Sequence, residues 1–150
     1  MDNKMNENNL LGAAFQLAFQ AHAGQFDKSG AAYIAHVVRV AARLETEDQQ
    51  IVGLLHDVVE DTETGLEAVR SHFGEDIAQA VDAITKRDGE PKDAYLARVR
   101  ANPLAHAVKL ADLADNSDPV RLSLLPPDIR ERLVRKYAHA KSVLGEVPTC

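Results

Sequence analysis

Tryptophan is absent from this 150-residue chain, and its single cysteine, Cys150, stands at the last position. One cysteine cannot form a disulfide within the chain, which is typical of a protein in a reducing cytoplasm. No apolar run approaches the length that spans a bilayer, and residues 1–9 are polar and rich in asparagine, without the apolar stretch of a signal peptide. We therefore expect a cytoplasmic protein without a membrane segment, in which residues 1–9 are disordered and residues 10–150 form one domain.

Positive charge is also in short supply. The chain has 17 Lys and Arg against 23 Asp and Glu, which gives a formal net charge of −6. Nucleic acids are bound through net positive surfaces, so this balance argues against a nucleic-acid-binding protein. It does not exclude a small phosphorylated ligand, because a metal ion and a few Lys or Arg can reverse the sign of the charge inside a pocket.

Sustained alternation of apolar and polar residues, which would predict strands, is missing as well. Apolar residues instead recur at three- and four-residue steps, and two capping boxes, at residues 46–49 and 64–67, mark helix starts. We predict an all-α bundle of six to eight helices, with no helix between Asp118 and Pro127. The expected helices cover residues 8–23, 33–44, 46–59, 64–73, 75–85, 92–101, 103–115 and 128–143.

The most informative stretch that is present runs from His56 to Asp61, with the letters HDVVED. It follows the apolar segment 51–55, which we expect to be a buried helix. Unpaired charge is costly in such a place, so three carboxylates and an imidazole there make sense if a metal ion compensates them. In this composition about 0.003 chance occurrences of His-Asp-x-x-Glu-Asp are expected. On a helix, His56 and Glu60 share one face, as do Asp57 and Asp61.

Further metal ligands would have to come from elsewhere in the chain. The candidates are the following residues: His22, His36, His72, His106, His139, Asp112 and Asp115. His36 stands out within an otherwise apolar helix, and Asp112 ends the apolar stretch that begins at Val108. Alone, either residue would have an ordinary explanation, as a core histidine with a partner or as an acid paired with Lys109. We expect a structural role for His22, and surface or helix-face positions for His72, His106 and His139.

Three segments together resemble the HD superfamily of metal-dependent phosphohydrolases: Tyr33 to His36, Leu54 to Thr62 and Lys109 to Asp112. More narrowly, they resemble the hydrolase domain of RelA/SpoT-type alarmone enzymes and the small alarmone hydrolases, over about residues 10–118. The resemblance implies one divalent metal, commonly Mn²⁺, which suits a mixed shell of nitrogen and oxygen ligands. The implied ligands are His36, His56, Asp57 and Asp112.

The resemblance also implies how the reaction proceeds. Glu60 and Asp61 would position and deprotonate the attacking water, and the metal would lower the pKa of that water. Asn116 falls where the family has an asparagine that contacts substrate, and Lys28 and Ser29 are candidates for substrate contact beside the pocket. The implied reaction removes pyrophosphate from the 3′ position of guanosine tetra- or pentaphosphate, so the expected partner is a small phosphorylated nucleotide.

The chain departs from the family in the part that reads the base. Asp27 stands where alarmone hydrolases have an arginine that helps to hold the nucleobase, which changes the local charge by two units. Residues 113–116, Leu-Ala-Asp-Asn, replace Arg-Leu-His-Asn, and residues 118–119, Asp-Pro, replace a pair like Arg-Thr. The alternatives are therefore hydrolysis of an adenosine alarmone or of the 2′-phosphate of NADPH, or a metal-bound nucleotide sensor without turnover. A sensor would not need Glu60 and Asp61. The oligomeric state is left open, a homo-oligomer included.

Overall fold

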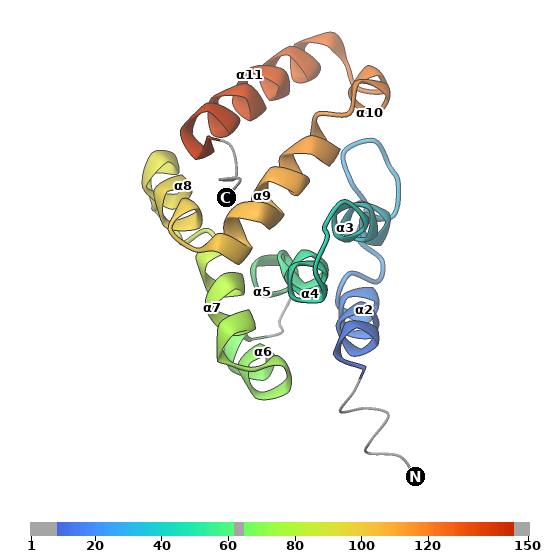
Figure 1. Ribbon diagram of the computed structural model, residues 1–150. Helices are drawn as coiled ribbons and strands as arrows, with labels where there is room; N and C mark the ends of the chain where they lie inside the picture. The colour runs from blue at the N-terminus through green and yellow to red at the C-terminus, as the bar shows by residue number, and fades with distance from the viewer. Residues whose placement is uncertain (1–8, 62–64, 146–150) are drawn as a thin grey trace.

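The computed structural model describes residues 9–61 and 65–145, apart from the side chain of Asp61 (Figure 1). All regular elements in these ranges are helices, and the single β-type contact is an isolated antiparallel bridge between Phe26 and Ala32. The all-α class is thus confirmed. The helices are α2 (Leu10–Ala21), α3 (Tyr33–Ala42), α4 (Glu47–Leu55), α5 (Val58–Asp61), α6 (Leu66–Phe73), α7 (Glu75–Ile84), α8 (Lys92–Arg100), α9 (Pro103–Asn116), α10 (Pro119–Ser123) and α11 (Pro127–Leu144).

The ends of the helices follow local chemistry. The capping box predicted at residue 46 is present: Gln49 N donates to Thr46 Oγ1 over 3.1 Å, and Thr46 N donates to Gln49 Oε1 over 3.3 Å. Asn9 caps α2 with its side chain, and the prediction of disorder otherwise concerns residues 1–8, which lie outside the described ranges. Thr64 of the second predicted capping box is also outside them, and the N-cap of α6 is Gly65.

Two short helices differ from the expectation. The helix predicted over residues 46–59 is interrupted at His56 and Asp57, so that α4 and α5 are separate. A short helix, α10, occupies the stretch that we expected to be a connection, because the side chain of Asp118 accepts a hydrogen bond from Val120 N and Pro119 fits the first turn. Both differences occur next to the candidate site.

Helix α4 lies at the centre of the bundle and packs against α2, α3, α7 and α9. Its residues 51–55 are all buried. Gly53 permits the close approach of α3, because a Cβ atom at this position would lie 3.3 Å from Ala41 Cα and 2.9 Å from Leu44 Cδ1. Helix α9 runs diagonally between α3 and α4 on one side and α8 and α11 on the other (Figure 1). Among the described helices, none combines the length and the apolar character needed to cross a membrane.

Candidate metal centre and adjoining pockets

Four side chains from three regions of the chain converge beside α4. His36 comes from the buried face of α3, His56 and Asp57 from the interruption between α4 and α5, and Asp112 from α9. One nitrogen or oxygen atom of each lies within 4.8 Å of the corresponding atoms of the others. The two histidines and Asp112 are buried. These are the four metal ligands that the family resemblance implies, and the fold brings them together from positions up to 76 residues apart.

The interruption of α4 explains how adjacent residues face the same point. On a continuous helix, the side chains of His56 and Asp57 would diverge by about 100°. Here His56 Nδ1 lies 2.6 Å from the carbonyl oxygen of Gly53. A carbonyl only accepts, so Nδ1 carries the proton and Nε2 is directed toward the cluster. The side chain of Asp57 is held by Tyr33, whose hydroxyl donates to Asp57 Oδ2.

His56 Nε2 is a buried atom without a hydrogen-bond partner among the described residues. It nevertheless lies 3.0 Å from Asp57 Oδ2 and 3.4 Å from Asp112 Oδ1. An imidazole nitrogen and two carboxylate oxygens that share a buried point without satisfying one another favour a cation between them. With His36 the donor set is two nitrogens and two carboxylates, which fits a divalent metal ion such as Mn²⁺, Fe²⁺, Co²⁺ or Zn²⁺.

The electrostatics of the cluster agree with this fit. Burial by itself would lower the pKa of His56, but Asp57 and Asp112 outweigh it and raise that pKa well above its ordinary value. Burial would raise the pKa of Asp112, but Lys109 and the two histidines hold it well below its ordinary range. The site therefore favours positive charge at its centre, whether the charge is a proton on His56 or a metal ion that replaces it.

Further polar side chains surround Asp112 and His36. Lys109 Nζ donates to Asp112 Oδ2 over 3.1 Å, and Asn116 Nδ2 donates to Asp112 Oδ1 over 3.2 Å. Asp115, one of the acids considered as a ligand, lies outside the cluster of four, with its carboxylate 2.6 Å from His36 Nδ1. Sequence reasoning assigned no role to Tyr33 at this site, although it lies in one of the three motif segments.

Of the two predicted water-activating side chains, the structure describes that of Glu60 and not that of Asp61. Glu60 is on α5, exposed, and lines a cavity that also contains Asp112. Asp61 ends α5, and its side chain is outside the described part of the structure. The cavity has a volume of about 240 Å³, and we call it the lysine pocket. Its lining is Glu60, Lys86, Lys92, Tyr95, Leu96, Lys109, Asp112, Leu113, Asn116, Lys136, Tyr137 and Ala140.

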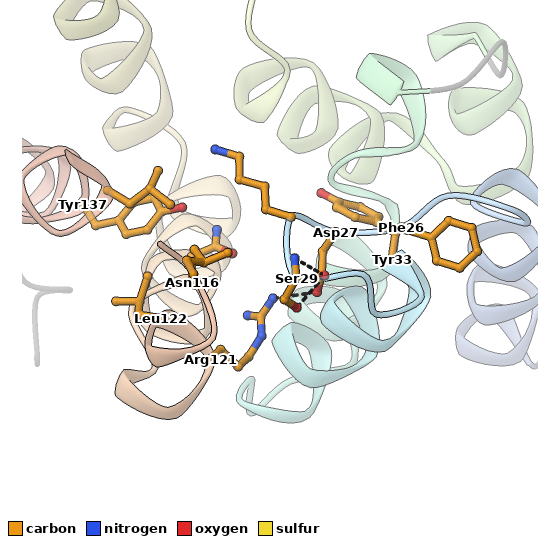
Figure 2. Close-up of a pocket in the computed structure, with 11 residues that line it drawn as sticks. Phe26, Asp27, Ser29, Tyr33, Asn116, Arg121, Leu122 and Tyr137 are labelled. Atoms are coloured by element: carbon orange, nitrogen blue, oxygen red, sulfur yellow. Dashed lines mark hydrogen bonds and ion pairs between the residues drawn. The ribbon is translucent and has the colours of Figure 1, made fainter. Parts of the chain in front are cut away.

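A second cavity of about 230 Å³, the aromatic pocket, adjoins the lysine pocket and shares Asn116 and Tyr137 with it (Figure 2). It is lined by Phe26, Asp27, Lys28, Ser29, Tyr33, Asn116, Arg121, Leu122, Leu125, Leu133 and Tyr137. All three predicted substrate contacts are therefore in its wall. Figure 2 shows the ring of Phe26 turned away from the other side chains of this pocket. Each cavity alone is smaller than a typical small-molecule site of about 300 Å³ or more, but Asn116 and Tyr137 belong to the walls of both.

Asp27 does not present an unpaired carboxylate to the aromatic pocket. Its Oδ1 accepts from Ser29 N, Ser29 Oγ and Ala31 N over 2.9, 2.7 and 2.9 Å, and its Oδ2 accepts from Arg121 Nη2 over 3.1 Å. Burial would raise the pKa of Asp27, but these hydrogen bonds lower it to about 2. The change of local charge expected from this acid is thus offset by an arginine from α10.

The remaining histidines lie outside the cluster. His22 is buried, with Nδ1 2.9 Å from Gln25 Oε1 and its ring centre 5.0 Å from that of Tyr33. His139 is exposed and pairs with Asp93. His106 is on a helix, α9, but it is buried rather than at the surface, and its Nε2 lies 3.0 Å from the carbonyl oxygen of Leu144 at the end of α11.

Comparison with known proteins places this geometry in context. Residues 14–136 match the model of a family described as HD domain. A probable GTP pyrophosphokinase of Mycobacterium leprae is 34% identical over 140 residues, which cover 85% of this chain and 18% of that protein. A guanosine-3′,5′-bis(diphosphate) 3′-pyrophosphohydrolase of Vibrio cholerae is 36% identical over 140 residues, or 84% and 20% of the two chains.

The bifunctional (p)ppGpp synthase/hydrolase SpoT of Escherichia coli strain K12 is 34% identical over 148 residues, or 90% of this chain and 21% of that protein. The chain thus spans about a fifth of the length of these three relatives. A solved structure, reported as a metazoan ortholog of SpoT that hydrolyses ppGpp, superposes with a TM-score of 0.77 at 24% identity. That likeness covers 94% of this chain and 88% of the other, and it shows that the two share a fold.

Proposed function

The chain belongs to the HD-domain family, and from this premise we propose that it is a metal-dependent phosphohydrolase that removes the 3′-pyrophosphate from guanosine 3′,5′-bis(diphosphate). The observation that carries the proposal is the position of the cluster of four. One of its members, Asp112, lines the pocket rich in lysine, and Tyr33, which donates to Asp57, lines the pocket with aromatic side chains. The relatives named as 3′-pyrophosphohydrolases support the choice of substrate.

The metal would be held by His36, His56, Asp57 and Asp112. We propose Mn²⁺, in keeping with the mixed set of nitrogen and oxygen donors. When bound, the metal supplies a water of lowered pKa and neutralises charge on the phosphate. Hydrogen bonds from neighbouring side chains orient the ligands: Tyr33 donates to Asp57, and both Lys109 and Asn116 donate to Asp112.

The lysine pocket would receive the phosphates. Burial lowers the pKa of Lys92, and the nearby Lys109 and Lys86 lower it further. Burial and the same group of lysines lower the pKa of Lys136 as well. Cations that repel one another in this way gain from a polyanion placed between them. A diphosphate in the lysine pocket would lie beside Asp112 and Glu60, which line the same cavity.

The aromatic pocket would receive the nucleoside. Tyr33 and Tyr137 offer ring surfaces, and Asn116 and Tyr137 line both cavities, where a ribose would join base to phosphate. Lys28 and Ser29 are proposed as substrate contacts from the loop that carries Asp27. We propose further that the chain acts in the cytoplasm, with a small nucleotide as its partner and without binding nucleic acid or membrane.

Glu60, with Asp61, would position the attacking water and accept its proton. The water oxygen forms a bond to the phosphorus on the ribose 3′ oxygen, and the bond from this phosphorus to that oxygen breaks. The 3′ oxygen takes up a proton, so the products are guanosine 5′-diphosphate and pyrophosphate. A nucleotide sensor would have no use for this pair of acids.

A second substrate is favoured by one observation, the engagement of Asp27 with Ser29, Ala31 and Arg121. The loop that carries an arginine for the base in alarmone hydrolases carries Asp27 here, and the carboxylate of Asp27 is occupied by hydrogen bonds within the protein. Recognition of guanine is therefore weaker here than in enzymes with that arginine, and we propose an adenosine alarmone as the alternative substrate.

The test is a product assay. The protein is freed of metal with a chelator, loaded with Mn²⁺, and given a panel of nucleotides with 3′-diphosphate or 2′-phosphate groups. We expect pyrophosphate and guanosine 5′-diphosphate in equal amounts. Glu60→Gln should keep its metal and lose about 10²-fold or more in turnover, whereas Asp82→Asn, at a half-buried acid outside both pockets, should keep the wild-type rate. Nucleotide binding without turnover by the loaded wild type would overturn the proposal in favour of a sensor.

A further inference from the structure

A fifth buried acid, Asp115, lies directly behind the cluster of four. Its side chain is 1% exposed, and it accepts from Arg39 Nε over 2.8 Å and from Arg39 Nη2 over 3.2 Å. It also accepts from Arg121 Nη1 over 2.8 Å and lies 2.6 Å from His36 Nδ1. All three of these arginine nitrogens donate to the carboxylate, so Asp115 is paired as an anion with two guanidinium groups.

The contact with Asp115 determines which nitrogen of His36 is available. A charged carboxylate only accepts, so His36 Nδ1 carries the proton of this hydrogen bond. Nε2 is then the atom that faces the cluster, 2.9 Å from Asp112 Oδ1. A carboxylate in this position fixes the tautomer and the orientation of a ligating imidazole and raises its basicity.

Arg121 connects this acid to the substrate loop. Its Nη1 donates to the backbone oxygen of Asp115 over 3.0 Å as well as to the carboxylate, and its Nη2 donates to Asp27 Oδ2. Asp27 belongs to the loop that carries Lys28 and Ser29. Figure 2 shows the side chain of Arg121 directed toward Asp27 and Ser29. Hydrogen bonds thus run from Asp27, in the wall of the aromatic pocket, through Arg121 and Asp115 to His36. Asp27 and Arg121 are 94 residues apart in the sequence.

We propose that Asp115 is a positioning residue for His36, and that Arg121 and Asp27 hold it in place, so that the affinity for metal depends on a loop of the substrate pocket. This inference rests on the proposed metal site. It assigns a role to residues 27 and 115, two of the positions at which the chain departs from the alarmone hydrolases, which have an arginine and a histidine there. The acid at each position is matched by Arg121, which contacts both.

A purely structural role for the same contacts makes a different prediction. If Asp115 only ties α3, α9 and α10 together, its removal lowers the stability of the protein but leaves the metal affinity of the folded molecules unchanged. If Asp115 positions His36, its removal weakens metal binding in molecules that are fully folded. Metal affinity measured well below the melting temperature therefore separates the two roles.

The experiment is calorimetric titration of the metal-free chain with Mn²⁺ at 15 °C, with folding of every variant verified by circular dichroism. We expect Asp115→Asn to weaken Mn²⁺ binding by about 10- to 100-fold. Arg121→Gln should weaken it by about tenfold, Asp27→Asn by less, and Arg121→Lys should recover part of the loss, since a cation is restored between the two acids. Arg70→Gln is the matched control, because Arg70 also joins two carboxylates, Glu67 and Glu75, but lines neither pocket.

The outcomes separate this inference from the proposed function. A wild-type chain that binds no Mn²⁺, or Asp57→Ala binding it as tightly as the wild type, would overturn the metal site itself. Tight binding by the wild type, together with dissociation constants within twofold of it for folded Asp115→Asn and Arg121→Gln, would overturn only the positioning role. If Asp115→Asn does not fold, Arg121→Gln tests the positioning role in its place, because the side chain of Arg121 is partly exposed and its replacement should be tolerated better by the fold.

Discussion

Replacing Lys109 with methionine tests how the buried charge of Asp112 is balanced. Lys109 Nζ donates to Asp112 Oδ2 over 3.1 Å and lies 5.5 Å from the centre of the Tyr95 ring. Burial by itself would lower the pKa of Lys109, but Asp112 outweighs it and raises that pKa, so the side chain is a cation at neutral pH. Methionine keeps an unbranched, flexible stem and removes the charge.

The expected loss follows from the burial of the pair. The side chains of Lys109 and Asp112 are 19% and 8% exposed. Removing one partner of a buried ion pair costs about 3–5 kcal/mol, but Asp112 keeps Asn116 as a hydrogen-bond donor and has His56 Nε2 3.4 Å from its Oδ1. A hydrogen bond to a charged group contributes about 1.5–3 kcal/mol, so we expect the metal-free protein to lose about 2–3 kcal/mol. For a chain of this length, that lowers the melting temperature by roughly 4–12 °C.

The same variant behaves differently once metal is bound. A cation ligated by Asp112 compensates the charge that Lys109 balanced, so the loss should be smaller in the Mn²⁺-loaded protein. Differential scanning calorimetry with and without Mn²⁺ measures both losses. The matched control is Lys136→Met, at a lysine of the same pocket for which the described part of the chain gives no ion pair, and it should lose less than about 0.5 kcal/mol. Equal losses with and without Mn²⁺, or no loss in either state, would refute the reasoning.

Three other changes test separate parts of the account. Gly53→Val would place a Cβ 3.3 Å from Ala41 Cα, with two further methyl groups beyond it. Urea unfolding should therefore show a free energy of unfolding lower by about 1–3 kcal/mol, because the core is overpacked. An unchanged urea midpoint would contradict the close approach of α3 and α4. The pKa of His56 is raised above its ordinary value of 6.5 in the metal-free fold, so protonated His56 stabilises this fold fully below pH 6.5, and the stabilisation is lost as the pH rises through the raised pKa. The free energy of unfolding without metal should therefore be lower at pH 9 than at pH 6. A higher free energy of unfolding at pH 9 would contradict the raised pKa. Asp27→Arg breaks the pair with Arg121 and should raise the ratio of kcat/KM for guanosine tetraphosphate over its adenosine counterpart; an unchanged ratio would dismiss a role of this position in base choice.

Much of the fold could be predicted from the sequence, because its helices carry their own signals. Periodic apolar residues, a capping box at Thr46 and Pro127 in the first turn of α11 mark elements whose bounds differ from the predicted ones by a few residues. The start of α10 also has a local signal in Asp118 and Pro119, but five residues are too few to produce a hydrophobic period.

The interruption at His56 and Asp57 could not be predicted from periodicity. The apolar pattern runs through it without a proline or an adjacent glycine, so local propensity favours a continuous helix. What ends α4 there is tertiary: His56 hydrogen-bonds back to Gly53, and Asp57 is held by Tyr33 from α3. Contacts over 24 residues of sequence leave no mark in the local pattern.

The candidate site was predictable to the extent that motif segments carry it. His36, His56, Asp57 and Asp112 lie in those segments, and the structure brings them together. The arginines around Asp115 could not be foreseen, because Arg39 and Arg121 reach it from two other helices and neither belongs to a motif. The lysine pocket is likewise a product of topology, since its cations come from α8, α9, α11 and the loop after α7.

The central claim is that one metal ion at the cluster of four drives hydrolysis of a 3′-pyrophosphate. It is tested most directly by following pyrophosphate release from guanosine 3′,5′-bis(diphosphate) while the metal-free chain is titrated with Mn²⁺. The account predicts that the rate rises linearly and levels off at about one equivalent of metal, and that Asp57→Ala releases no pyrophosphate at any concentration of Mn²⁺. Full activity in the presence of excess chelator, or in Asp57→Ala, would contradict it.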